Sequence, residues 1–360
     1  MTTTPRELQV LNRIETFRQR RPRLLEDVIT LAHGAGGKSS AALTDAVFLE
    51  GFRNPTLETL GDSAALTLPG GERLAFSTDS YVVQPMQFPG GSIGHLAVHG
   101  TVNDLSVCGA EPKWLSAGFV IEEGLDIAVL RQIVADMAQA AARAGVEIVT
   151  GDTKVVARGA ADGLFINTAG VGIVPPGSRL GPELVRPTDR ILLSGTMGEH
   201  GMAVMLARGE LNIEADIRSD TAPLNGIIAD LLAAAPHTRW MRDATRGGVG
   251  TVLNELAQSA NVGVVIEESR LPVRPIVNGA CDLLGIDPLY VANEGKFVAV
   301  VPLEESQAAL AALRAHDLGT DAAIIAEVVA EPPGIVALRT PFGGSRIVDM
   351  LVGHPLPRIC

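Results

Sequence analysis

Cysteine is scarce in this chain of 360 residues, which contains only Cys108, Cys281 and Cys360. An odd number of cysteines at wide spacing argues against a disulfide framework and favours a reducing compartment. We therefore expect a cytoplasmic protein in which Cys108 and Cys281 are buried apolar residues. No apolar run reaches the roughly 18 residues of a membrane-spanning helix, and the first residues contain no apolar signal region. The formal net charge of −12 makes nucleic acids and anionic membranes unfavourable partners.

Lysine is rare as well. Of the 29 basic residues, the lysines are Lys38, Lys113, Lys154 and Lys296. Because arginine is used almost everywhere else, a lysine is expected where a compact, titratable ammonium is needed and a planar guanidinium is not. Chance is the alternative, particularly for Lys113.

The composition is that of a globular protein with two domains. Hydrophobic residues make up 46% and charged residues 19% of the chain, and its length is sufficient for two sizeable cores. Both halves alternate strand and helix patterns, which predicts an α+β fold of mixed sheets with helices packed on one face. A rigid break at 175–177 (Pro-Pro-Gly) marks the domain boundary. The expected units are an N-terminal extension with a short amphipathic helix (1–27), a first domain (28–176), a second domain (177–342) and a mobile C-terminal tail (343–360).

Local patterns predict most of the individual elements. Asp126 is expected to cap a helix that runs to Ala144 and stops at Gly145. The other expected helices cover 41–48, 92–108 and a stretch from about 243 to 260, for which Asp243 is a possible cap. The expected strands cover 28–31, 74–78, 146–150, 164–174, 190–194, 261–267 and 297–301, and the apolar run at 146–150 is typical of a buried strand.

A glycine-dense loop precedes the expected helix at 41–48. Gly34, Gly36 and Gly37 stand immediately before Lys38, and such a loop allows backbone N–H groups to approach an anion closely. The sequence does not follow the Walker A pattern, so an ordinary turn is the alternative. We expect the neighbouring His33 to be structural.

Five aspartates stand at strand ends, in loops or at helix starts: Asp62, Asp79, Asp104, Asp152 and Asp243. Carboxylates are ligands that Mg²⁺ prefers, usually one or two per ion, with phosphate oxygens completing the shell. Together they favour a magnesium–nucleotide site assembled from several loops, although each alone could be a cap or a turn. Lys154 follows Asp152 by two residues, so on a strand both side chains face the same way.

The last residues of the chain predict a stiff arm that bears a thiol. Pro355 and Pro357 favour an extended, polyproline-like conformation up to Cys360. With a hinge at Gly343 and Gly344, the segment could span about 50 Å when fully extended. We interpret Cys360 as the carrier of a covalently bound substrate. The alternative is a frayed chain end with an incidental cysteine.

Several motifs occur together in one order along residues 28–360. They are the Gly34–Lys38 loop, Gly61-Asp62, Thr78-Asp79-Ser80, Asn103-Asp104-Leu105, Gly151-Asp152-Thr153-Lys154, Asp243-Ala244-Thr245-Arg246-Gly247-Gly248 and Ala292-Asn293-Glu294-Gly295. This set resembles the aminoimidazole ribonucleotide synthetase superfamily of ATP-dependent enzymes. With the terminal Pro357-Arg358-Ile359-Cys360 it is similar to the carbamoyl dehydratases of [NiFe]-hydrogenase maturation. One difference is Ser63, which follows Asp62 where family members often have a second acid.

The resemblance implies a two-domain PurM-like architecture and a homodimer formed through the first domains. It also implies a reaction, in which the carbamoyltransferase HypF places a carbamoyl group on the terminal thiol. ATP then drives its dehydration to a thiocyanate, whose cyanide passes to iron held by the HypC–HypD complex. Other readings are a selenophosphate synthetase or thiamine phosphate kinase type of enzyme, or a non-catalytic maturation scaffold.

The same resemblance implies roles for individual residues. Cys360 would carry the substrate, Glu294 would act as the base for the amide protons, and Lys154 would contact phosphate or the activated amide oxygen. A structural carboxylate is the alternative for Glu294. The implied nucleotide-binding residues are Gly34, Gly36, Gly37, Lys38, Asn103, Asp243, Thr245 and Gly247, and the implied magnesium ligands are Asp62, Asp79, Asp104 and Asp152.

Overall fold

The computed structural model describes residues 24–209 and 215–351. The helix expected in the N-terminal extension lies outside these residues, as do Cys360 and the prolines before it. Within the described ranges, no helix is both long enough and apolar enough to cross a bilayer.

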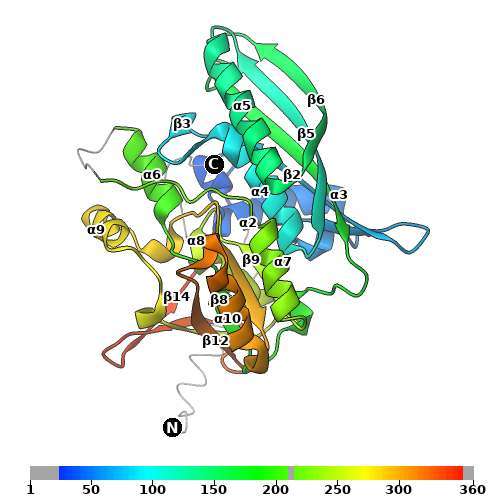
Figure 1. Ribbon diagram of the computed structural model, residues 1–360. Coiled ribbons are helices and arrows are strands. Elements are labelled where there is room, and N and C mark those ends of the chain that lie inside the picture. The colour runs from blue at the N-terminus through cyan, green and yellow to red at the C-terminus, as the bar shows by residue number, and fades with distance from the viewer. Residues whose placement is uncertain (1–23, 210–214, 352–360) are drawn as a thin grey trace.

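The first domain is built on a five-stranded sheet with the order β1-β2-β7-β5-β6 (Figure 1). Its strands are β1 (Ala64–Thr67), β2 (Arg73–Tyr81), β5 (Glu111–Glu122), β6 (Glu147–Val156) and β7 (Leu164–Val174). Only β5 and β6 are parallel neighbours; the other pairs are antiparallel. A small separate ribbon is formed by β3 (Gln87–Phe88) and β4 (Gly91–Ser92).

Helices cover one face of this first sheet, as predicted. They are α4 (Ile93–Val107) and α5 (Ile127–Ala144). Asp126 caps α5 by accepting a hydrogen bond from the Ala128 N–H (2.7 Å), and Gly145 ends the helix with φ +68°. The opposite face exposes large apolar side chains, among them Phe76, Trp114, Ile148 and Ile173.

The second domain contains a seven-stranded sheet with the order β14-β13-β10-β12-β8-β11-β9. The strands are β8 (Arg190–Leu193), β9 (Trp240–Asp243), β10 (Gly263–Glu267), β11 (Phe297–Val301), β12 (Ala323–Val329), β13 (Val336–Arg339) and β14 (Ser345–Val348). The helices are α6 (Glu199–Ala207), α7 (Asn225–Ala234), α8 (Gly248–Ser259), α9 (Pro275–Leu284) and α10 (Ser306–Ala315).

This second sheet is covered on both faces, unlike the first. On β11, which lies between β8 and the edge strand β9, Val298 and Val300 pack in the core that contains α8, whereas Phe297, Ala299 and Val301 pack in the core that contains α7 and α10. Every residue of β11 is therefore buried, which explains its unbroken apolar run.

Helix α4 lies at the junction of the domains. All its residues except His95 are buried, because it packs against β2 and β7 on one side and against β9 and α7 of the second domain on the other. A helix that is apolar on all sides is typical of such a central position. Polar residues on α4 therefore face protein groups or a cavity rather than bulk water.

Two local predictions were wrong. Residues 28–31 form no strand; instead a 3₁₀ helix covers Leu31–Gly34, where the Thr30 N–H donates to His33 Nδ1 (3.0 Å), so His33 is structural as expected. The strand at 146–150 exists as part of β6 but is exposed rather than buried, because it is the edge strand of its sheet. The expected helix at 41–48 is confirmed as part of a longer helical stretch, which consists of α2 (Lys38–Leu43), a π-helical segment (Thr44–Leu49) and α3 (Glu50–Phe52).

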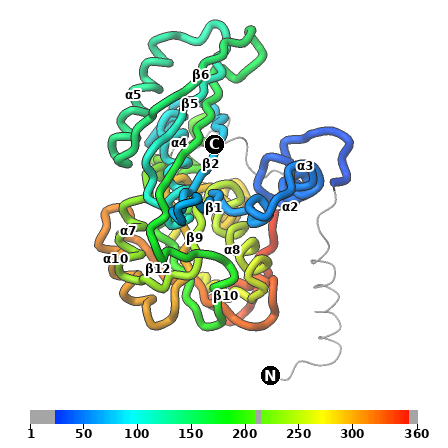
Figure 2. The backbone as a smooth tube through the Cα atoms, turned by 90° about the vertical axis from the view of Figure 1, so that its right-hand side faces the viewer, coloured from blue at the N-terminus to red at the C-terminus, as the bar shows by residue number. Residues whose placement is uncertain are grey.

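The proposed hinge at Gly343 and Gly344 is also wrong. These glycines lie in the turn between β13 and β14, where Gly343 has φ +83° and the Thr340 N–H donates to the Gly344 carbonyl (2.9 Å). The chain therefore remains part of the second domain through β14. It then passes beside α2 (Figure 2). There the Lys38 N–H donates to the carbonyl oxygen of Leu351, the last residue that the structure describes (3.1 Å).

Candidate active site

A large cleft of about 3250 Å³ runs between the two domains. Most of the residues predicted from sequence line it: Gly36, Gly37, Lys38, Asp62, Asp79, Asp104, Asp243, Thr245 and Glu294. The described candidates that do not line it are Gly34, Asn103, Asp152, Lys154 and Gly247. The cleft is therefore the candidate active site.

The glycine-rich loop forms one wall of the cleft and contacts two other segments. Gly36 has φ +78°, and a Cβ atom there would lie 2.9 Å from the carbonyl oxygen of Arg246. A Cβ on Gly37 would lie 2.5 Å from the Leu351 oxygen, so both positions require glycine. Lys38 Nζ is 2.9 Å from Asp349 Oδ2. Gly34 contributes only its carbonyl oxygen, which accepts from Arg246 (3.1 Å).

The ends of β9 and β11 place Asp243 and Glu294 near each other. Asp243 is the last residue of β9, and its register partner on β11 is Phe297. Beyond this pair the two loops stay joined, because the Ala244 N–H donates to the Lys296 carbonyl and the Asn293 N–H to the Ala244 carbonyl (3.0 Å each). Backbone hydrogen bonds thus hold the Asp-Ala-Thr-Arg and Asn-Glu-Gly-Lys motifs side by side.

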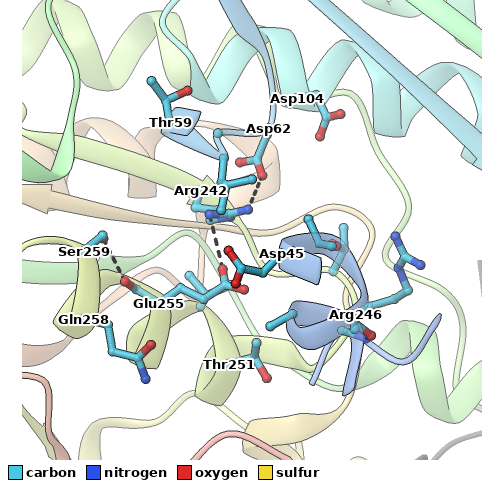
Figure 3. A pocket seen from close by; sticks show the side chains of 18 of the residues that line it. Asp45, Thr59, Asp62, Asp104, Arg242, Arg246, Thr251, Glu255, Gln258 and Ser259 are labelled. Atoms are coloured by element: carbon cyan, nitrogen blue, oxygen red, sulfur yellow. Dashed lines mark hydrogen bonds and ion pairs between the residues drawn. The ribbon is translucent and has the colours of Figure 1, made fainter. Parts of the chain in front are cut away.

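Three carboxylates from three elements meet in the cleft. Oxygens of Asp62, Asp104 and Asp243 lie within 4.8 Å of one another, and Asp62 and Asp104 lie close together in Figure 3. Burial, together with the neighbouring Asp243 carboxylate, raises the pKa of Asp104 well above its usual range. Burial and Asp62 do the same to the pKa of Asp243. Such a cluster is stabilised by a divalent cation, and the spacing fits Mg²⁺, whose opposite ligands are about 4.2 Å apart.

Asp79 lines the cleft beside this cluster. Its carboxylate accepts from the Tyr81 hydroxyl (3.2 Å). Burial raises the pKa of Asp79, and the nearby Arg246 opposes that shift.

Arg242 is a site residue that sequence reasoning missed. Its guanidinium pairs with Asp62 (2.9 Å) and with Glu255 of α8 (3.2 Å, Figure 3). It thereby joins the first-domain loop that carries Asp62 to the second domain. The signal available in the sequence was a charged residue inside an otherwise apolar strand, directly before Asp243.

Glu294 is buried, with 3% of its surface exposed, yet it reaches the cleft. Burial, reinforced by Asp243, raises the pKa of Glu294 well above its usual range. A carboxylate with a raised pKa is the stronger base once it has lost its proton. Its position and environment are therefore those of a general acid–base group.

The prediction that Asn103 contacts a nucleotide is wrong. Its amide N–H groups donate to the carbonyls of Ala222 (3.1 Å) and Glu294 (3.2 Å), and its oxygen accepts from the Leu224 N–H (2.8 Å). Asn103 is fully buried and faces the second domain, whereas its neighbour Asp104 faces the cleft. When a helix is buried on all sides, sequence spacing alone does not show which of its residues face a cavity.

Asp152 does not join the other aspartates in this chain. It lies on the exposed edge strand β6, where its carboxylate pairs with Lys154 Nζ (2.6 Å), and this hydrogen bond lowers the pKa of Asp152. The prediction that the two side chains face the same way is confirmed. Within one chain, Asp152 therefore does not share a ligand set with Asp62 and Asp104.

The remaining residues singled out from the sequence are Gly247, Cys281 and Cys108. Gly247 has φ +80° at the start of α8 and does not reach the cleft. Cys281 is buried, as predicted, whereas Cys108 is only partly buried and lines the cleft.

The fold and the carboxylate cleft define the class of AIR synthase related proteins. The family model for the N-terminal domain of AIR synthase related proteins matches residues 60–174, and the model for the C-terminal domain matches residues 186–339. Carbamoyl dehydratase HypE of Rhodobacter capsulatus is 55% identical over 339 residues, which are 94% of this chain and 99% of that protein.

Two solved structures extend this similarity. The crystal structure of a HypE–HypF complex contains a chain that is 46% identical with a TM-score of 0.82, covering 86% of this chain and 100% of its own. HypE crystallised in complex with ATP is 47% identical with a TM-score of 0.77, covering 92% of this chain and 100% of its own. The chain belongs to the HypE family of carbamoyl dehydratases.

Proposed function

We propose that this chain is an ATP-dependent carbamoyl dehydratase that converts a carbamoyl group on Cys360 into a thiocyanate. The observation that carries the proposal is the 55% identity to a carbamoyl dehydratase across nearly the full length of both chains. The cleft supports it, because the chain leading to Cys360 passes along its wall through Asp349 and Met350. Cys360 is the ninth residue after Leu351, so the thiol lies no farther than about 30 Å from Leu351.

The chemistry is a dehydration in two stages. The amide oxygen of the S-carbamoyl group attacks the γ-phosphorus of ATP, ADP leaves, and nitrogen loses its first proton. The C–O bond then breaks, phosphate leaves, and nitrogen loses its second proton to give S–C≡N. The overall change is the loss of one water from the carbamoyl group, balanced by hydrolysis of ATP to ADP and phosphate.

The residues of the cleft supply what these stages require. Glu294 accepts the nitrogen protons, a role that fits its buried position and raised pKa. Gly36, Gly37 and Lys38 face the nucleotide phosphates. The crystal structure of a HypE protein with ATP supports ATP as the nucleotide.

The carboxylate cluster is the candidate magnesium site. Asp62, Asp104 and Asp243 would hold the ion, with Asp79 beside them. Mg²⁺ would there neutralise charge on the phosphoryl group that is transferred. This set differs from the sequence prediction, because Asp243 replaces Asp152.

Lys154 can contact the phosphate or the activated amide oxygen only if the Lys154 side chain of a second copy of this chain reaches the cleft. In one chain it lies on the edge strand of a sheet whose uncovered face exposes Phe76, Trp114 and Ile148. We propose that the homodimer forms through this first domain, because an apolar face of this kind is typical of an interaction surface. Lys154 would then serve the cleft of the partner copy.

Two partners follow from the proposed reaction. The crystal structure of a HypE–HypF complex supports HypF as the source of the carbamoyl group. An iron-carrying HypC–HypD complex would accept the cyanide, since thiocyanate on a protein is a bound intermediate that another component must consume.

Mass spectrometry of the C-terminal peptide tests the proposal. Incubation with HypF, its carbamoyl donor and ATP should first add one carbamoyl group to Cys360 and then remove one water. The same reaction without ATP should stop at the carbamoyl adduct. A peptide that keeps its carbamoyl group in the presence of ATP would refute the dehydratase, and a carbamoyl group on another residue would refute Cys360 as the carrier.

A further inference from the structure

The main chain of Glu294 is held on both sides by side chains from distant segments. Its N–H donates to Asp220 Oδ1 (3.1 Å). Its carbonyl oxygen accepts from the Asn103 amide (3.2 Å). The backbone N–H and the backbone carbonyl of Glu294 are thus both bound by side chains rather than by a neighbouring strand. This happens where the chain enters the cleft.

Asp220 is itself fixed in place. Its second oxygen accepts from Lys296 Nζ (3.1 Å), and the two side chains are only 6% and 9% exposed. The segment around Asp220 packs so tightly on the Glu294 loop that a Cβ on Gly295 would overlap the Asp220 carbonyl oxygen. The loop therefore cannot shift without moving the Asp220–Lys296 pair.

Asn103 connects this arrangement to the first domain. In addition to Glu294, it binds the carbonyl of Ala222 and the N–H of Leu224. One turn earlier on α4, His99 Nδ1 lies 2.9 Å from the Thr221 hydroxyl. Helix α4 thus holds segment 220–224 at successive points, and that segment in turn holds Glu294.

We propose that Asn103 and Asp220 are positioning residues that fix Glu294 relative to the carboxylate cluster. The same helix carries Asn103 and, as the next residue, Asp104 of that cluster. One rigid element therefore sets the position of the proposed base and of one proposed metal ligand. A displacement of about 1 Å in such an arrangement can lower a rate by about 100-fold. The inference rests on the proposed function, in which Glu294 is the base.

A matched pair of double variants tests the role of Asp220. In D220N/K296M the buried charges are gone, but the asparagine oxygen still accepts from the Glu294 N–H. In D220A/K296M the charges are equally gone and the acceptor is lost. We expect kcat for dehydration of the carbamoylated protein to stay within about threefold of the wild type in the first variant, and to fall at least about tenfold in the second.

Two further measurements distinguish a role in positioning Glu294 from a general loss of stability. Carbamoylation of Cys360 by HypF and KM for ATP should be equal in both variants, because neither depends on Glu294. In an E294Q background the two variants should dehydrate at the same low rate, since the group they position is already disabled. Equal kcat of the two double variants in the presence of Glu294 would overturn the role of Asp220.

A second variant covers the case in which D220A/K296M does not fold. N103L removes the donor to the Glu294 carbonyl while keeping the size of the side chain, and it should also lower kcat at least about tenfold with KM for ATP unchanged. Wild-type kcat in N103L would overturn the role of Asn103. Wild-type protein that forms no thiocyanate would refute the proposed function itself, and the positioning role with it.

Discussion

Neutralising Asp104 should stabilise the metal-free protein while weakening its response to magnesium. Oxygens of Asp62, Asp104 and Asp243 lie within 4.8 Å of one another. Two unit charges at that distance repel by about 3.5 kcal/mol at an effective dielectric constant of 20. Because the pKa of both Asp104 and Asp243 is raised by burial, part of this repulsion is already relieved by protonation. We therefore expect Asp104→Asn to stabilise the metal-free fold by about 1–3 kcal/mol.

The pH dependence follows from the same pKa shift. A carboxyl group whose pKa is raised in the folded state binds its proton more tightly there than in the unfolded chain. Its contribution to stability is full below the unfolded pKa and is lost as the pH rises through the folded pKa. The metal-free wild type should therefore lose stability as the pH rises from the usual aspartate range towards neutrality. This loss should be smaller in D104N, in which asparagine also still accepts from the Ser77 hydroxyl.

Thermal unfolding with and without Mg²⁺ and ATP measures both effects. Without metal, Tm of D104N should exceed that of the wild type, and the increase in Tm caused by Mg²⁺ should be smaller in the variant. Asp230→Asn is the matched control: it makes the same chemical change at an exposed position of α7 that does not line the cleft, and it should leave both quantities almost unchanged. A D104N protein that is less stable without metal, or that keeps the full response to Mg²⁺, would refute the argument.

Other predictions concern the reaction. Glu294→Gln should accept the carbamoyl group from HypF but convert it at least about 100-fold more slowly; wild-type conversion, followed by mass spectrometry, would exclude Glu294 as the base. Cys360→Ala should form no thiocyanate and still bind ATP, as measured by calorimetry; thiocyanate found elsewhere in this variant would show that another residue carries the substrate. If Lys154 serves the partner's cleft, mixed dimers of Lys154→Ala and Glu294→Gln chains should regain up to about half of the wild-type activity per dimer, because one of their two clefts is intact, and neither variant has this activity alone. Mixed dimers as inactive as their parents would place both residues in the same cleft.

Sequence patterns predicted the elements that depend on local chemistry. Helix α5 begins and ends at the expected residues because Asp126 and Gly145 act within one turn of the chain. The apolar run of β6 was misread because burial of a strand depends on its neighbours in the sheet, and β6 has a neighbour on one side only. Gly343 and Gly344 were misread for a similar reason. Glycine is favoured both in a hairpin turn and in a flexible hinge, and only the pairing of β13 with β14 shows that these two form a turn.

The candidate site was predictable where a motif ends at the cleft. Asp62, Asp104 and Asp243 were found by their positions at loops and element ends, and they meet as a magnesium site would require. Asn103 was misassigned because its direction is set by the second domain, which is distant in sequence. Arg242 was missed because its role comes from two partners, Asp62 and Glu255, that only the folded chain brings together.

The contact between Leu351 and the glycine-rich loop has a kinetic consequence. A thiol confined within about 30 Å of that anchor has a local concentration on the order of 10 mM, whatever path the intervening residues take. The cleft then needs little affinity of its own for the small carbamoyl group, because its covalent attachment to the chain already keeps its local concentration high. Dehydration should consequently be first order in loaded protein, unaffected by dilution of assembled enzyme, and indifferent to free carbamoyl compounds in solution.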